Sequence, residues 1–167
     1  FDFEKFPSAT GHLGVQMQSV GEVMSIGRTF RESIQKAFRS LEVGLDGLEP
    51  KVANNSDPSI KRSRPLDLKS LRFATSYRLL KIKEAFLKGT TLEEIYKLTN
   101  IDPWFLHQIK MISSFNKNNS LKELKQNGFS DAQISRMLNK SLLEIRKTRI
   151  SESINPVFKV VDTCAAE

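Results

Sequence analysis

At 167 residues the chain can bury one ordinary hydrophobic core, or one compact domain with an extended tail, and it is short for a two-lobed ligase fold. Hydrophobic residues at 39% and charged residues at 27% exclude a disordered chain, and no apolar run approaches the roughly 20 residues of a membrane helix. The N-terminus lacks the basic and apolar layout of a secretion signal, so we expect a cytoplasmic protein that does not contact a membrane.

The net charge of +7 makes an acidic partner worth considering, and nucleic acid is the usual acidic partner of a basic protein. Residues 51–88 contain ten Lys or Arg against three Asp or Glu, a surplus of seven that equals the net charge of the whole chain. The basic excess therefore belongs to one segment.

The first predicted elements are an extended appendage and a helix. Residues 1–26 contain three glycines whose spacing suits an extended or turning path better than one long helix. Thr29 and Glu32 then form a capping box, and apolar residues recur at helical spacing from Phe30 until Gly44. This pattern predicts a helix after the appendage.

A linker and a series of closely spaced helix starts follow. Residues 45–70 include Gly47, three prolines and the run Asn-Asn-Ser-Asp-Pro at 54–58, which predicts an irregular basic linker. Capping boxes and one Asp-Pro start recur beyond it, and Gly89 and Gly128 stand where two helices should end. The helices that these signals predict lie near residues 76–88, 91–99, 102–116, 120–127, 130–138 and 141–151.

The end of the chain has a different pattern. Residues 157–161 follow Pro156, alternate in polarity and include β-branched side chains, which predicts a short strand. Together the elements predict an all-α fold, a bundle of five to seven short helices with an extended N-terminal appendage and a short C-terminal strand-like exit.

The residue patterns of catalytic and metal sites are missing. Gly21 and Gly27 lack the Gly-Lys-Ser/Thr ending of a phosphate-binding loop, and the sequence contains no nucleophile elbow and no paired acidic cluster. His12 and His107 lie far apart, and Cys164 has no partner base, so we interpret the cysteine as a small buried hydrophobe. We predict no catalytic residue, no metal site and no cofactor in this chain.

Two helical segments allow a rival interpretation. The predicted helices at 130–138 and 141–151 resemble a helix-turn-helix, with a tight joint and basic residues late in the second helix. Arg146, Lys147 and Arg149 could contact nucleic-acid phosphates, but basic residues in a last helical turn also complement the helix dipole. The second helix does not begin with a cluster of base-reading side chains.

Trp104 and Phe105 open the helix after Asp102-Pro103 and have two possible roles. They could anchor an interface, because Trp and Phe dominate buried hot spots, or they could belong to the core of a small helical domain. The neighbouring His107 is interpreted as a surface or hydrogen-bonded polar residue and not as a base.

Two N-terminal segments form a recognisable pattern, Phe-Glu-Lys-Phe-Pro at residues 3–7 and the segment 16–30, which contains Gly-Glu-Val-Met and Ile-Gly-Arg-Thr-Phe. This pattern closely resembles one enzyme family, the large subunit of carbamoyl-phosphate synthase. Residues 98–106, 128–131 and 161–167 resemble the helical oligomerisation domain of that family, up to its exit toward a second ATP-grasp unit.

The resemblance implies a division of the chain. Residues 1–44 would form the end of the first ATP-grasp domain, which makes carboxyphosphate, and residues 71–156 would form the helical oligomerisation domain. Residues 157–167 would be the exit segment toward the second synthetase half. Nothing from the family is carried onto the basic residues 51–70.

The resemblance also implies a function. The chain would be a non-catalytic linker and oligomerisation region, inactive alone, of an ATP-dependent ligase that makes carbamoyl phosphate from bicarbonate, ATP and glutamine-derived ammonia for arginine and pyrimidine synthesis. ATP and Mg (or Mn) would bind elsewhere in the parent enzyme. The expected partners are other copies of the chain, the rest of the large subunit and a glutaminase small subunit. The alternative is a basic nucleic-acid-binding module.

One residue receives a role from the resemblance. Glu22 matches the glutamate of the Gly-Glu-Val-Met motif and would lie toward the passage through which carbamate moves between the two phosphorylation sites. Since a buried carboxylate without a partner costs several kcal/mol, Glu22 should face water or a cation. The other interpretation is an exposed or capping glutamate.

Overall fold

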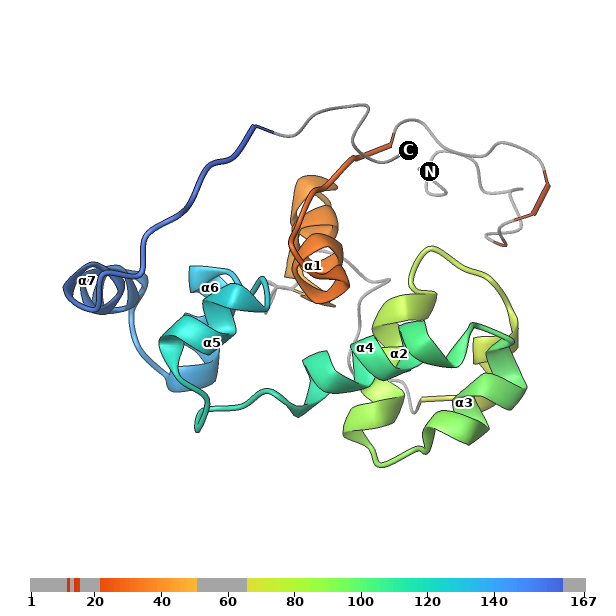
Figure 1. Cartoon of the computed structure of the whole chain (residues 1–167). Coiled ribbons are helices and arrows are strands. Elements are labelled where there is room, and N and C mark those ends of the chain that lie inside the picture. Colours follow the sequence, from red (N-terminus) through yellow and green to blue (C-terminus); the bar gives the residue numbers. More distant parts are fainter. Residues whose placement is uncertain (1–11, 13, 16–21, 51–65, 161–167) are drawn as a thin grey trace.

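The chain folds as a set of short helices around one core. The computed structural model describes residues 12, 14–15, 22–50 and 66–160 (Figure 1). Within these ranges it has seven α-helices, one 3-10 helix and one two-stranded hairpin, which confirms the predicted all-α fold. In chain order the elements are α1 (Phe30–Ser40), β1 (Leu45–Gly47), β2 (Glu49–Pro50), η2 (Leu68–Arg72), α2 (Arg78–Leu87), α3 (Leu92–Thr99), α4 (Pro103–Ser114), α5 (Leu121–Gln126), α6 (Asp131–Leu138) and α7 (Leu142–Ser151).

The helices begin where the capping signals predict them. Asp102 caps α4 by accepting a hydrogen bond from the Trp104 backbone N–H at 2.8 Å, with Pro103 in the first turn. In three helices the N-cap hydroxyl and the side chain three residues later satisfy each other's backbone N–H groups. These reciprocal pairs are Thr91 with Glu94, Ser130 with Gln133, and Ser141 with Glu144.

Two predicted capping boxes, at the starts of α1 and α5, form differently. In α5 the Ser120 hydroxyl accepts from the Glu123 backbone N–H at 3.2 Å, but the Glu123 carboxylate accepts from the Asn119 side chain at 3.1 Å.

The other of these two capping boxes is at the start of α1. The Thr29 hydroxyl accepts from the Glu32 backbone N–H at 3.2 Å, as predicted. The Glu32 carboxylate, however, accepts from the Arg28 backbone N–H at 2.8 Å and also pairs with Lys36 at 2.6 Å. The start of α1 is therefore held by two side chains and by the residue that precedes the cap.

The helices form two groups that α1 joins. In Figure 1, α2, α3, α4 and η2 lie together on one side, while α5, α6 and α7 lie on the other, and α1 packs against α4 and the hairpin. One apolar cluster runs through both groups. Its fully or nearly fully buried members include Leu48, Leu71, Ile82, Ile95, Leu106, Ile109, Ile112, Leu124, Phe129, Ile134 and Ile145.

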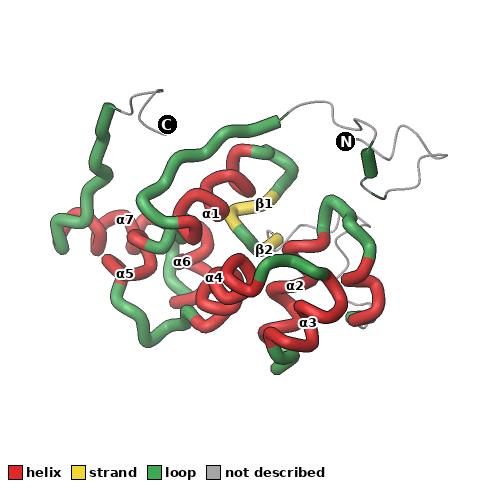
Figure 2. The backbone as a smooth tube through the Cα atoms, turned by 45° about the vertical axis from the view of Figure 1, so that its right-hand side comes forward, coloured by secondary structure: helices red, strands yellow, loops and turns green. Residues whose placement is uncertain are grey.

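The hairpin was not predicted from the sequence. β1 pairs with β2 in antiparallel orientation and lies between α1 and α2 (Figure 2). Leu45 and Leu48 are buried there, although the composition places residues 45–50 in the irregular linker. This part of the predicted linker contributes to the core, and its continuation at 51–65 lies outside the described residues.

The two ends of the predicted domain plan are only partly described. α1, which the resemblance assigns to the preceding domain, packs against elements of the helical group, and the assignment of residues 1–44 stays a prediction. Residues 157–160 form neither helix nor strand, because no neighbouring strand is present to pair with them in the described part of the chain. Residues 161–167 of the exit segment, including Cys164, lie outside it.

A buried pair of glutamine side chains ties α1, the hairpin and α6 together. Gln35 Oε1 accepts from the Leu48 backbone N–H and from Gln133 Nε2, both at 3.1 Å. Gln35 Nε2 donates to the Asn127 carbonyl at 3.3 Å, and Gln133 Nε2 also donates to Glu49 Oε1 at 2.9 Å. Both glutamines are almost completely buried, so these bonds replace those that water would make.

A charged pair and a glycine complete this polar group. Lys83 is nearly buried, and its ammonium lies 3.8 Å from the second oxygen of Glu49. Burial lowers the pKa of Lys83, and the charge of Glu49 acts in the opposite direction. Gly47 is needed for close approach, since a Cβ there would lie 2.5 Å from Gln133 Nε2 and 2.6 Å from Gln35 Oε1.

Replacing Gln35 tests this arrangement. We expect Gln35→Ala to lower the free energy of unfolding by about 2–4 kcal/mol, because it leaves the Leu48 N–H and the Gln133 amide without a shared acceptor and opens a small cavity. The urea midpoint followed by far-UV circular dichroism measures the change. Gln126→Ala, on the exposed face of α5, is the control and should leave the midpoint unchanged. Equal midpoints for the two variants would contradict a structural role of the buried pair.

Candidate interface surface

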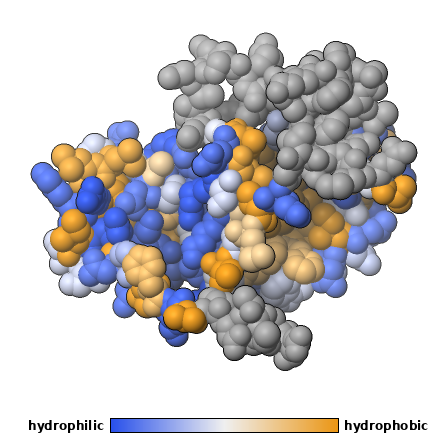
Figure 3. Space-filling view, turned by 90° about the horizontal axis from the view of Figure 1, so that it is seen from above, coloured by the Kyte–Doolittle hydropathy of each residue, from blue (hydrophilic) through white to orange (hydrophobic). Residues whose placement is uncertain are grey.

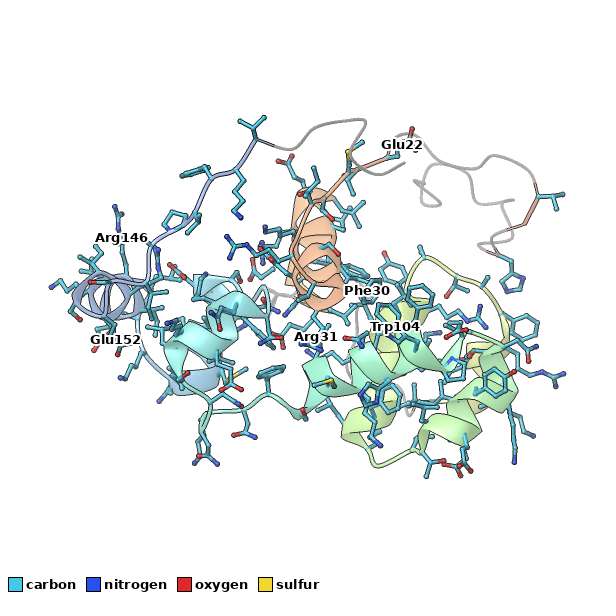
Figure 4. The ribbon with its side chains drawn as sticks, viewed as in Figure 1. Glu22, Phe30, Arg31, Trp104, Arg146 and Glu152 are labelled. Atoms are coloured by element: carbon cyan, nitrogen blue, oxygen red, sulfur yellow. The ribbon has the colours of Figure 1, made fainter. Side chains whose placement is uncertain are left out.

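Three aromatic rings gather where α1 and α4 begin. The Phe30 ring lies 5.5 Å from the Trp104 ring and 5.1 Å from the Phe105 ring, and Trp104 lies 5.0 Å from Phe105, all in edge-to-face geometry. Figure 4 shows Phe30 and Trp104 facing each other from the two helices. We call Phe30, Trp104 and Phe105 the aromatic cluster.

The aromatic cluster lies at the surface. Leu106, Ile109 and Ile112 recur every three residues and direct one face of α4 into the core. Trp104 precedes Leu106 by two residues, about 200° around the helix, and therefore points away from the core. Trp104 is 54% exposed and Phe105 is 42% exposed. Neither ring is therefore buried in the core, which was the alternative to an interface role.

Arg31 fixes the position of the cluster. Its Nε donates to Asn127 Oδ1 at 2.7 Å, and one terminal nitrogen donates to Gln108 Oε1 at 2.8 Å (Figure 4). These bonds tie α1 to α4 and to the end of α5, and they hold the neighbouring Phe30 ring against α4. Sequence reasoning missed Arg31, because partners 77 and 96 residues away leave no local signal.

An ion cluster joins α5, α6 and α7 on the other side of the molecule. Asp131 accepts from Lys125 Nζ at 2.8 Å and lies 3.3 Å from a terminal nitrogen of Arg149. Burial alone would raise the pKa of Asp131, but the hydrogen bond and charge of Lys125, with the charge of Arg149, lower it overall. Arg149 is therefore engaged within the fold.

The predicted helix pair of the nucleic-acid interpretation does form, as α6 and α7. Asn139, in the left-handed conformation at φ 52°, ends α6 and makes the tight joint. Arg146 and Lys147 are exposed, whereas Arg149 binds Asp131. Of the three basic residues that could contact phosphates, two remain available to a partner.

The remaining candidate residues lie apart from both clusters. Glu22 is exposed in the segment that leads into α1, and Figure 4 shows it far from Trp104. His107 is exposed on α4, and His12 stacks on the Phe73 ring at 5.0 Å. Among the described residues, no group of three or more His, Cys, Asp or Glu could hold a metal ion, and no helix is long and apolar enough to cross a membrane.

Comparisons with known proteins identify the helical unit. Residues 22–153, which include every described helix, match the family model of the carbamoyl-phosphate synthetase large chain, oligomerisation domain. The chain belongs to this family. It is 44% identical to the carbamoyl phosphate synthase large chain of Halomonas eurihalina, 43% to that of Buchnera aphidicola and 40% to that of Archaeoglobus fulgidus.

The family match concerns one part of a longer protein. Each of these alignments covers 100% of this chain but 16% of the carbamoyl phosphate synthase large chain that it matches. The matched range includes every described helix and the aromatic cluster. It therefore includes α1 and Phe30, which the resemblance assigned to the preceding domain, as well as the helices from α2 to α7. None of these comparisons favours a nucleic-acid-binding module.

The ion cluster gives a pH-dependent prediction. Because the pKa of Asp131 is lower in the folded chain than the usual aspartate value of 3.8, its contribution to stability is fully present above that value and is lost as the pH falls through the folded pKa. We expect Asp131→Asn to lower the free energy of unfolding by about 1–2 kcal/mol at pH 7, since Lys125 and Arg149 lose their counter-charge.

Urea unfolding at neutral pH and at progressively lower pH measures this difference. The gap between the two proteins should narrow as the pH falls below 3.8, where Asp131 of the unchanged protein becomes protonated. Glu93→Gln, at an exposed position of α3, is the control and should leave the midpoint at pH 7 unchanged. If the difference in free energy of unfolding between the unchanged protein and Asp131→Asn stays constant at every pH down to the lowest one measured, the Asp131 charge does not stabilise the fold.

Proposed function

We propose that the aromatic cluster is the surface through which this oligomerisation domain contacts another copy of the chain. The observation that carries the proposal is the 54% exposure of Trp104 beside Phe105 and Phe30. Trp is enriched in interface hot spots, and two exposed rings packed on a half-buried third form an apolar patch that is costly to leave in water.

The arrangement of the cluster supports a contact between rigid surfaces. The Asp102 cap, Pro103 in the first turn and the Arg31 bonds hold the two helices in place. A partner would therefore meet rings that are already ordered, so these side chains would lose little conformational entropy when the contact forms. The contact would depend on apolar area and not on the net charge of the chain.

The parent protein is an ATP-dependent ligase in this proposal. It would make carbamoyl phosphate from bicarbonate, ATP and ammonia released from glutamine, with ATP and Mg (or Mn) bound in parts of the large chain outside the present sequence. Its partners would be a glutaminase small subunit and further large chains in the cytoplasm. This chain alone would have no turnover and would link and assemble the catalytic parts.

Glu22 would border the passage for carbamate in the same parent protein. The exposure of its side chain supports this role, because a carboxylate that faces water avoids the desolvation cost of a buried charge. The segment that follows Glu22 is bonded to α1, since Ser25 Oγ donates to the Ser33 carbonyl at 2.7 Å and Lys36 Nζ donates to the Ile26 carbonyl at 3.0 Å. Glu22 itself lies before these bonds and is exposed, so its carboxylate is free to meet another part of the large chain.

The self-association proposal predicts a concentration-dependent mass. We expect sedimentation equilibrium of the chain to show a reversible dimer or larger species that persists between about 50 and 200 mM salt, as an apolar contact should. The double substitution Trp104→Ala with Phe105→Ala should weaken association at least about thirtyfold, because even one truncated hot spot costs about 2 kcal/mol and about 1.4 kcal/mol corresponds to a factor of ten.

Tyr96→Ala is the matched control, since Tyr96 is 43% exposed but lies on α3 outside the aromatic cluster. It should leave association unchanged. Trp104 is the only tryptophan, so its fluorescence should shift to shorter wavelength as the unchanged protein associates. A strict monomer, or equal association of the double variant and the control, would rule out the aromatic cluster as the contact.

The Glu22 proposal is tested in the intact large chain. We expect Glu22→Ala to raise the amount of ATP hydrolysed per carbamoyl phosphate formed several-fold, with thermal stability unchanged because the side chain is exposed. Glu93→Ala, also exposed but on α3, is the control for a lost surface charge. If Glu22→Ala hydrolyses as much ATP per carbamoyl phosphate as the unchanged enzyme does, Glu22 does not border the carbamate passage.

A further inference from the structure

The position of α7 is fixed although few of its residues are buried. Ile145 is its one buried side chain in the described structure, and α6 is the main element on which it packs. Arg149 binds Asp131 at 3.3 Å and donates to the Ile154 carbonyl at 3.4 Å. These contacts set the rotation of α7 about its axis, so the opposite face is presented outward in a defined way.

That outward face carries large apolar side chains. Leu143 is 61% exposed and Ile150 is 59% exposed, and a spacing of seven residues places them on the same side of the helix. Hydrophobic side chains are visible beside hydrophilic ones at the end of the molecule that α7 occupies (Figures 1 and 3). A helix of ten residues is marginal by itself, so covering this face would also stabilise the helix.

Basic side chains lie between the two apolar residues. Arg146 and Lys147 are exposed and lie within one turn of both Leu143 and Ile150. Glu144, on the same helix, accepts the backbone N–H and the hydroxyl of Ser141, both at 2.7 Å, and these two bonds lower its pKa more than the charge of Lys147 does. Figure 4 shows Arg146 and Glu152 projecting to different sides of α7, so Glu152 does not neutralise this face.

These features define the partner by its chemistry. A second copy does not complement the face, because antiparallel pairing about a two-fold axis would place Arg146 and Lys147 against the same residues of the other copy. Nucleic acid would match the positive charges but would leave Leu143 and Ile150 without apolar contacts. An amphipathic helix with carboxylates between two apolar side chains matches both properties.

We propose that Leu143, Arg146, Lys147 and Ile150 form a docking face for an acidic amphipathic helix of a different polypeptide segment. The apolar side chains of the partner would cover Leu143 and Ile150, and its carboxylates would pair with Arg146 and Lys147. This face is separate from the aromatic cluster on α1 and α4, so docking here does not depend on the self-association proposed above.

The test uses the full chain and a designed probe. The probe is a fluorescent peptide of about 16 residues with two leucines seven positions apart and two glutamates midway between them, on a helix-forming background. In fluorescence anisotropy titrations at about 100 mM salt, we expect it to bind at least about tenfold tighter than the same peptide with glutamine at the two glutamate positions.

Variants of the chain locate the site. Leu143→Ser with Ile150→Ser should reduce the affinity for the probe at least about tenfold, and Arg146→Glu with Lys147→Glu should switch the preference to a peptide with two lysines in place of the glutamates. Leu87→Ser, at an exposed position of α2, is the matched control and should bind the probe normally. Circular dichroism and urea midpoints confirm that each variant is folded.

Three outcomes would overturn the docking proposal. The first is equal binding of the glutamate and glutamine peptides, or no binding of either. The second is displacement of the probe by a single-stranded oligonucleotide at lower concentration than by unlabelled peptide, which would assign the face to nucleic acid. The third is loss of self-association in the Leu143→Ser and Ile150→Ser variant, which would assign it to a second copy. A chain that binds the probe but stays monomeric would reject only the aromatic-cluster contact.

Discussion

The hydrogen bonds that Gln35 and Gln133 make with each other and with their neighbours hold the structure together at its centre. They are made in an environment almost free of water, so each bond is strong and each unmet donor or acceptor would be costly. The same two side chains fix the hairpin through Leu48 and Glu49, and the hairpin in turn packs against α1 and is linked to α2 by the ion pair of Glu49 with Lys83. The apolar core fills the volume, and these polar bonds determine which helices face one another across it.

Local signals and distant contacts explain what the sequence could and could not predict. The helix starts were predictable because a capping box such as Ser141 with Glu144 lies within four consecutive residues, so the residue types alone indicate where the helix begins. The hairpin was not predictable, since Gly47 and Leu48 acquire their roles only beside Gln35 and Gln133. Helical spacing placed Trp104 on a helix but left open which side of α4 faces the core, because that depends on the packing of other helices.

The two proposed contact surfaces follow from the way the helices are grouped. The aromatic cluster lies where α1 meets α4, and the docking face of α7 lies at the far end of the other group. Side-chain bonds fix the position of both surfaces. Arg31 fixes the aromatic cluster, and the ion pair of Asp131 with Arg149 fixes the docking face of α7. An assembly domain of this design could bind a like partner on one side and an unlike partner on the other without either contact disturbing the core.

The long separation between Gln35 and Gln133 also determines the order in which the domain can be made. α1 leaves the ribosome before α6, and its buried glutamine finds its partner only after a further 98 residues have been synthesised, which takes about 5–20 s at usual elongation rates. The α2, α3 and α4 helices contact one another locally and can pack earlier. During that interval Gln35 already has the hairpin beside it but lacks Gln133, so the buried polar group that orders the centre of the domain is completed only when α6 emerges.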